Sequence, residues 1–115
     1  LTIFIKKNTT NMQIQFNTDK TISGNERNQE YFTTLISKGL GRFEDHLTRV
    51  EAHLSDENGE KSGTNDIKCL LEARVEGKQP VVVTNNGDTV EKAISGAIDK
   101  MKNSLTTIIG RKQNR

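Results

Sequence analysis

Residues 67–75 read Ile-Lys-Cys-Leu-Leu-Glu-Ala-Arg-Val, and this stretch decides the fold. Apolar or small side chains stand at every odd position, and three of the four even positions carry a charge. Such alternation is typical of a β-strand that buries one face and exposes the other. A sheet built from strands of this kind needs a second layer over its apolar face, and helices are the usual cover.

Three more segments have the character of strands. Residues 12–17 and 50–54 alternate between apolar and polar side chains, and 80–84 is a short β-branched run that opens with Pro80. Because proline cannot donate a backbone hydrogen bond, this last strand is expected to start there or to lie at a sheet edge. Residues 55–66 are all polar or glycine and predict a long connecting loop.

Two segments have the period of an amphipathic helix. The first begins at a capping box of Ser23 and Glu26 and buries Phe32, Leu35, Ile36, Leu40, Phe43 and Leu47. Gly39 and Gly41 interrupt it and weaken it or mark a close approach by another element. The second begins at a capping box of Asp88 and Glu91, buries Val90, Ala93, Ile94, Ala97, Ile98, Met101, Leu105 and Ile108, and is expected to end at Gly110.

The predicted order is therefore β-α-β-β-β-α, an α+β two-layer sandwich with a four-stranded sheet and two helices packed on one face. A chain of 115 residues fits one domain. We assign 12–110 to that domain, 1–11 to an N-terminal extension outside the fold, and 111–115 to a basic tail. No apolar run is long enough to cross a membrane, and the single cysteine, Cys69, favours the cytoplasm.

The sequence gives little support for catalysis. Cys69 falls on the buried face of its strand, whereas His53 alternates with buried neighbours and His46 ends the first helix. A cysteine–histidine pair is therefore not expected, and the cysteine is interpreted as a small core residue. The chain lacks the cluster of ligands that a metal site needs. We expect no enzymatic activity, no cofactor, no metal and no small-molecule substrate.

The charge is small but unevenly distributed. The formal net charge is +2, and it divides into +1 over residues 1–47, −2 over 48–87 and +3 over 88–115. On the first helix, Arg27, Lys38 and Arg42 fall in one sector opposite the apolar stripe, together with Tyr31. This basic sector with an aromatic side chain is either an RNA contact surface or a solvated helix face. Basic residues are spread more widely over the polar side of the second helix: Lys92, Lys100 and Lys102. On electrostatic grounds we count Lys92 and Lys102 among the candidate RNA-binding residues.

Four stretches, taken with this element order, resemble the ribosome hibernation-promoting factors, also called ribosome-associated translation inhibitors and formerly sigma-54 modulation proteins. They are residues 12–16, 40–54, 69–74 and 88–105, the last with its Ala97-Ile98-Asp99-Lys100-Met101 core. The resemblance implies a non-enzymatic protein that docks on the small ribosomal subunit and inhibits translation during stress or stationary phase. It also implies that basic residues of both helices contact ribosomal RNA: Lys38, Arg42, Lys100, Arg111 and Lys112.

The chain departs from the family pattern in two places. Residues 106–110 read Thr-Thr-Ile-Ile-Gly where the family is rich in lysine, and the acidic segment 55–66 is longer than in short members. We therefore expect a divergent short form that is monomeric and lacks the dimerisation domain of long members. The alternative is a protein-interaction module that uses the same scaffold without binding the ribosome. Its contact surface would be the acidic loop and the neutral sheet face: Gln13, Gln15, Glu51, His53 and Glu72.

Overall fold

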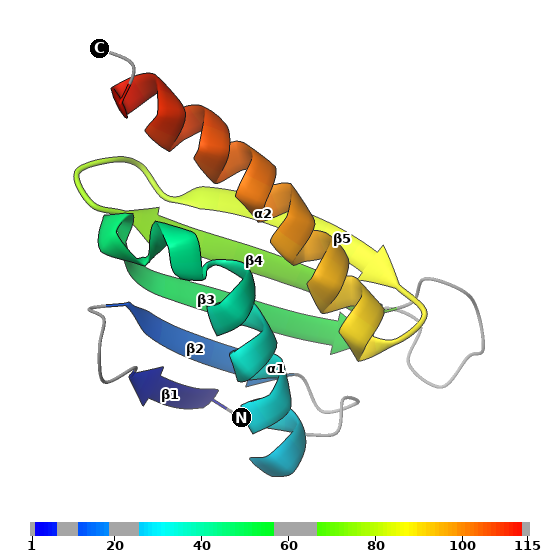
Figure 1. The fold of residues 1–115 in the computed structure, drawn as a ribbon. Coiled ribbons are helices and arrows are strands. Elements are labelled where there is room, and N and C mark those ends of the chain that lie inside the picture. Colours follow the sequence, from blue (N-terminus) through cyan, green and yellow to red (C-terminus); the bar gives the residue numbers. More distant parts are fainter. Residues whose placement is uncertain (1, 7–11, 19–25, 57–66, 114–115) are drawn as a thin grey trace.

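The computed structural model describes residues 2–6, 12–18, 26–56 and 67–113 (Figure 1). Over these residues the chain forms β1 (Thr2–Lys6), β2 (Gln13–Thr18), α1 (Glu26–Gly39), the short 3-10 helix η1 (Gly41–His46), β3 (Leu47–Asp56), β4 (Ile67–Val75), β5 (Val81–Gly87) and α2 (Val90–Gln113). The four predicted strands and two predicted helices are all present in the predicted order. β1 is an additional outer strand, drawn from residues that the sequence analysis left outside the fold.

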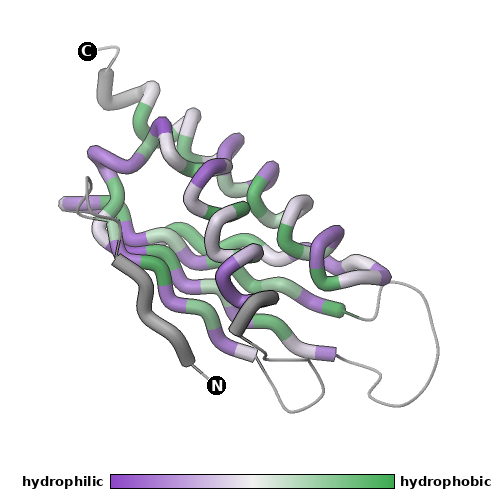
Figure 2. Tube along the Cα trace, turned by 60° about the horizontal axis from the view of Figure 1, so that its bottom comes forward, coloured by the Kyte–Doolittle hydropathy of each residue, from purple (hydrophilic) through white to green (hydrophobic). Residues whose placement is uncertain are grey.

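The strands form one mixed sheet in the order β1-β2-β3-β4-β5. β2 and β3 are parallel and are joined through α1, and the other neighbouring pairs are antiparallel. β5 lies at an edge, as its opening Pro80 predicted, and Gly77 takes φ +76° in the turn before it. Both helices lie on the same face of the sheet, so the molecule has two layers and one open sheet face (Figures 1 and 2).

The core fills the space between the sheet and the helices. In the strands, the buried positions alternate as predicted, and Val50, Ala52, Cys69, Leu71 and Ala73 are fully buried. Burial raises the pKa of the Cys69 thiol to about 12. His53 lies on the open face, so the two side chains point to opposite sides of the sheet, as expected.

The first helix is shorter than predicted. It ends at Gly39, η1 follows, and Leu47 already belongs to β3. The helices approach each other closely at Gly39, because a Cβ built on it would lie 2.5 Å from Cγ2 of Ile98 in α2. Leu40 closes α1 by donating its N–H to the carbonyl of Ile36 at 3.0 Å. The predicted cap at Ser23 lies outside the described residues.

The N-cap of the second helix lies one residue after the predicted cap, Asp88, and the helix ends later than predicted. The hydroxyl of Thr89 accepts the backbone N–H of Lys92 at 3.1 Å, so Thr89 is the N-cap. The helix runs through Gly110 to Gln113, which corrects the expected end. Ile109 is buried, whereas Ile108, which was predicted to be in the core, is only half-buried. β5 continues beyond residue 84, the end of the predicted strand, to Gly87, and the missing side chain of Gly87 allows α2 to start close by.

Candidate nucleic-acid interface

The two helices run side by side in the same direction. Near their starts, the Tyr31 hydroxyl donates to Oε2 of Glu91 at 2.9 Å. Further along, Nη2 of Arg42 in η1 donates to Oγ1 of Thr106 at 2.9 Å. All four side chains are exposed, so these two hydrogen bonds connect the helical segments on the side that faces solvent. The bond to Glu91 is also the main cause that raises the pKa of Tyr31.

Two contacts hold the Arg42 side chain in place. Its guanidinium lies over the Phe43 ring, 4.7 Å from the ring centroid, and the bond to Thr106 holds one of its nitrogens. A guanidinium has five N–H donors in a fixed plane, so most remain available to an incoming phosphate.

Lys38 and Lys102 lie along the groove between the helices. Lys38 is exposed in the last turn of α1, two turns after Tyr31 and therefore on the same helix face. Lys102 is one turn after Ile98, which approaches Gly39 of α1, and one turn before Thr106, which accepts the hydrogen bond from Arg42 of η1. These three residues, Lys38, Arg42 and Lys102, form what we call the interhelix cations.

The remaining predicted cations on α2 lie elsewhere. Lys100 donates from Nζ to the backbone carbonyl of Thr84 at 2.8 Å, which places it on the side of α2 that faces β5. Lys92 pairs with Asp88, with Nζ and Oδ1 3.3 Å apart, in the first turns of the helix. Both side chains are exposed, so neither contact removes its charge from solvent. The structure therefore divides the predicted basic residues into an interhelix group and an outer pair.

Three predicted site residues lie outside the described side chains. Arg27 belongs to the first turn of α1, and Arg111 and Lys112 belong to the last turns of α2. Their backbone positions put Arg27 at the end of the helix pair away from Arg42, and put the other two beyond Thr106, at the same end as Arg42.

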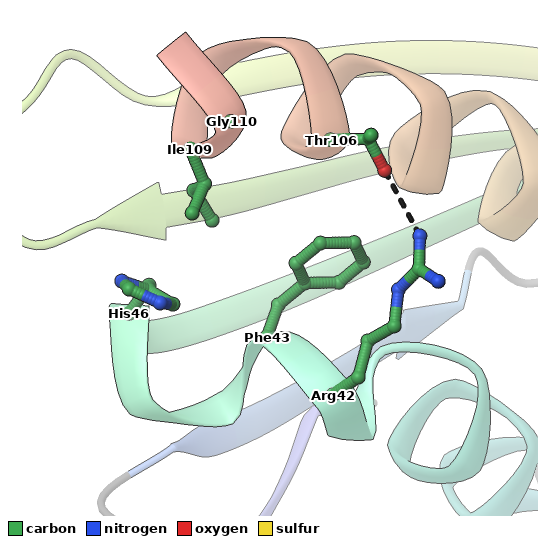
Figure 3. A pocket seen from close by; sticks show the side chains of 6 residues that line it. All are labelled: Arg42, Phe43, His46, Thr106, Ile109 and Gly110. Atoms are coloured by element: carbon green, nitrogen blue, oxygen red, sulfur yellow. Dashed lines mark hydrogen bonds between the residues drawn. The ribbon is translucent and has the colours of Figure 1, made fainter. Parts of the chain in front are cut away.

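A pocket at the end of the groove was missed by the sequence analysis. It has a volume of about 300 Å³ and is lined by Arg42, Phe43, His46, Thr106, Ile109 and Gly110 (Figure 3). The pattern Arg-Phe-x-x-His was visible in the sequence as a cation and two flat rings near a helix end. Its opposite wall comes from α2, more than 60 residues later, and no local pattern reveals that pairing.

The open sheet face carries a ring of polar contacts over β2 and β3. Arg49 donates to Gln15, Gln15 to Asn17 at 3.5 Å, and Asn17 to Nδ1 of His53 at 3.1 Å. Glu51 closes the ring, because its carboxylate lies 3.5 Å from Nε2 of His53 and 3.3 Å from Nε of Arg49. The predicted polar face thus exists, and much of its hydrogen-bonding capacity is used internally.

Other kinds of site find no support in the part of the chain that the structure describes. No group of three or more His, Cys, Asp or Glu side chains there could hold a metal ion. Among the same residues, no helix is long and apolar enough to cross a membrane.

Comparisons with known proteins agree with this architecture. Residues 18–113 match the family model described as Sigma 54 modulation protein / S30EA ribosomal protein. The N-terminal domain of Protein Y from Thermus thermophilus is similar with a TM-score of 0.63 at 14% identity, over 81% of this chain and 94% of that one. A ribosomal subunit interface protein from Coxiella burnetii gives a TM-score of 0.63 at 13% identity, over 84% and 97%. No curated protein gives a significant match.

Proposed function

Because the chain belongs to the Sigma 54 modulation protein / S30EA ribosomal protein family, we propose that it is a non-enzymatic protein of the cytoplasm that binds the ribosome. Its partner in this proposal is the RNA of the small subunit, and its effect is to inhibit translation during stress or stationary phase. The observation that carries the proposal is the line of interhelix cations, which lies within the matched region on the exposed side of two parallel helices.

The physical basis is electrostatic. RNA presents a dense row of phosphates, and each phosphate that a lysine or arginine neutralises releases condensed counterions. Lys38 and Lys102 supply point charges along the groove, and Arg42 supplies a plane of donors whose position Phe43 and Thr106 fix. Three phosphate contacts predict that log K falls with log salt with a slope of about −2 to −3. A protein of this size bound to the decoding region would exclude messenger RNA by occupancy alone.

Co-sedimentation with purified small subunits at low and moderate salt tests the proposal. We expect the protein to move with the subunits at low salt and to dissociate as salt rises. Charge reversal by Lys38→Glu and Arg42→Glu should abolish co-sedimentation at moderate salt. Arg74→Glu is the matched control, because Arg74 is an exposed arginine on the open sheet face. A protein that stays at the top of the gradient at low salt would contradict ribosome binding.

Inhibition requires a separate measurement. In a reconstituted translation reaction, the wild-type protein should lower the yield of a reporter, and Arg42→Glu should restore it. If the protein binds subunits but leaves the reporter yield unchanged at saturation, it is a ribosome-associated protein without inhibitory activity.

The alternative function is a protein-interaction module, and the charged open face favours it. Arg74 pairs with Glu72 at 3.7 Å next to the ring of contacts on β2 and β3, and Val82 nearby is 52% exposed. A partner protein of mixed charge would fit this face better than RNA would, because acidic and basic groups alternate on it. Pull-down of a partner that is lost on deletion of residues 57–66 or on Glu72→Ala, but indifferent to Lys38→Glu, would support this alternative.

A further inference from the structure

The pocket next to Arg42 has features that phosphate contacts alone do not use. It has an apolar floor, because Phe43 and Ile109 are almost fully buried, and it has Arg42 and His46 at opposite ends of that floor (Figure 3). A surface that binds only phosphates needs donors and positive charge and gains nothing from an apolar floor between them.

The two ends of the pocket carry flat groups. The Arg42 guanidinium is held against Phe43 and tied to Thr106, and His46 brings its imidazole to the other end of the Phe43 ring (Figure 3). Guanidinium planes and histidine rings are groups on which proteins stack unpaired RNA bases. Both side chains are at least partly exposed, so a planar ligand can reach them from solvent.

The size and the remaining polar atoms also fit a single base. A volume of about 300 Å³ is at the lower end of the range for ligand sites, which suits one small ring system. The Thr106 hydroxyl also lines the pocket and can hydrogen-bond to a base edge. The interhelix cations run from this pocket along the groove, so a strand whose base enters the pocket would have its neighbouring phosphates beside them.

We propose that this pocket receives one unpaired base of the RNA that the interhelix cations contact. The inference rests on the proposed function, since it needs RNA at this face, and it adds a site for a base to a site for phosphates. The base would enter the pocket beside Phe43 and Ile109, between the His46 imidazole and the free face of the Arg42 guanidinium.

Substitution of His46 separates stacking from charge. His46→Phe keeps a flat ring and removes the ring nitrogens, whereas His46→Ala removes the ring. We expect His46→Ala to weaken binding to purified small subunits by about tenfold, within the range found for losing one base-stacking side chain. His46→Phe should bind within about twofold of wild type. The matched control is the same pair of substitutions at His53, on the open sheet face, which should leave binding unchanged.

Chemical probing of the Watson–Crick edges of the ribosomal RNA gives the decisive readout. At saturating protein, wild type and His46→Phe should protect one unpaired base that stays reactive with bound His46→Ala. Equal protection by all three proteins would overturn the base pocket and leave ribosome binding intact. Equal loss in both His46 variants would also overturn it, in favour of a charge contact. A wild-type protein that fails to bind subunits would remove the proposed function and this inference together.

Discussion

The spacing of the two helices depends on Gly39, and we predict that Gly39→Ala destabilises the protein. The added Cβ would lie 2.5 Å from Cγ2 of Ile98, about 1 Å inside ordinary carbon–carbon contact. Ile98 cannot easily move aside, since it is 5% exposed and a β-branched side chain in a helix strongly prefers one rotamer. Overpacking of this kind lowers the free energy of unfolding by about 1–3 kcal/mol, whereas replacing glycine by alanine in a helix raises it by up to about 1 kcal/mol.

The net expectation is a loss of about 1 kcal/mol in the free energy of unfolding, measured by urea denaturation. Gly110→Ala is the matched control, because a Cβ built at Gly110 meets no atom within 4 Å. That substitution should raise stability by about 0.5–1 kcal/mol. A double-mutant cycle identifies the cause, since Ile98→Ala removes Cγ2 and should make Gly39→Ala neutral or stabilising. The reasoning is refuted if Gly39→Ala stabilises the wild-type chain as much as Gly110→Ala does.

Three further predictions concern single side chains. With its pKa raised to about 12 by burial, Cys69 should resist a disulfide reagent at about pH 8 until urea unfolds the chain. The part of the free energy of unfolding that is linked to this pKa shift is present below pH 9, the ordinary pKa of a cysteine thiol, and is lost as the pH rises toward 12. Urea denaturation in a series of alkaline buffers measures this loss. Glu91→Gln should lower the raised pKa of Tyr31, because the hydrogen bond to the Glu91 carboxylate is its main cause; ultraviolet absorbance of tyrosinate follows the titration. Thr89→Ala should lower the free energy of unfolding by about 1 kcal/mol through loss of the α2 cap, and an unchanged urea midpoint would show that the cap contributes nothing.

Local patterns were sufficient for most of the fold. The alternation in residues 67–75 predicted β4 to the residue, and the family resemblance drawn from the sequence is confirmed by the match over residues 18–113. The errors lie where tertiary contacts override local preference. α1 ends at Gly39, where Ile98 of α2 approaches it, and Gly110 lies inside α2 in a turn where Ile109 is buried. β1 has an apolar centre too short to identify by itself, and pairing with β2 makes it a strand.

The sequence indicated which basic residues are candidates for the site, but it did not indicate how those of the two helices are placed relative to each other. Helical spacing predicted Lys38 and Arg42 in one sector of a single helix; both side chains are exposed, but α1 ends at Gly39 and Arg42 belongs to η1, so they do not share one helix face. Spacing within α2 could not decide which lysines face α1, because that depends on how the two helices are rotated against each other. The hydrogen bond between Arg42 and Thr106 shows which side of α2 faces η1, and Lys102 lies on that side, one turn before Thr106. The hydrogen bond between Lys100 and Thr84 places Lys100 on the side of α2 that faces β5.

The parallel packing of the helices explains how a net charge of +2 can accompany a surface suited to RNA. In residues 26–37 and 90–98 the helices carry two basic and three acidic residues, whereas 38–46 and 99–113 carry six basic and three acidic. Parallel helices bring their later halves to the same end, so charge that is modest along the sequence becomes concentrated in space. Basic side chains there also oppose the negative ends of the two helix dipoles, which stabilises the helices. The pocket lies at that same end, so the site proposed for a base adjoins the most positive part of the helix layer.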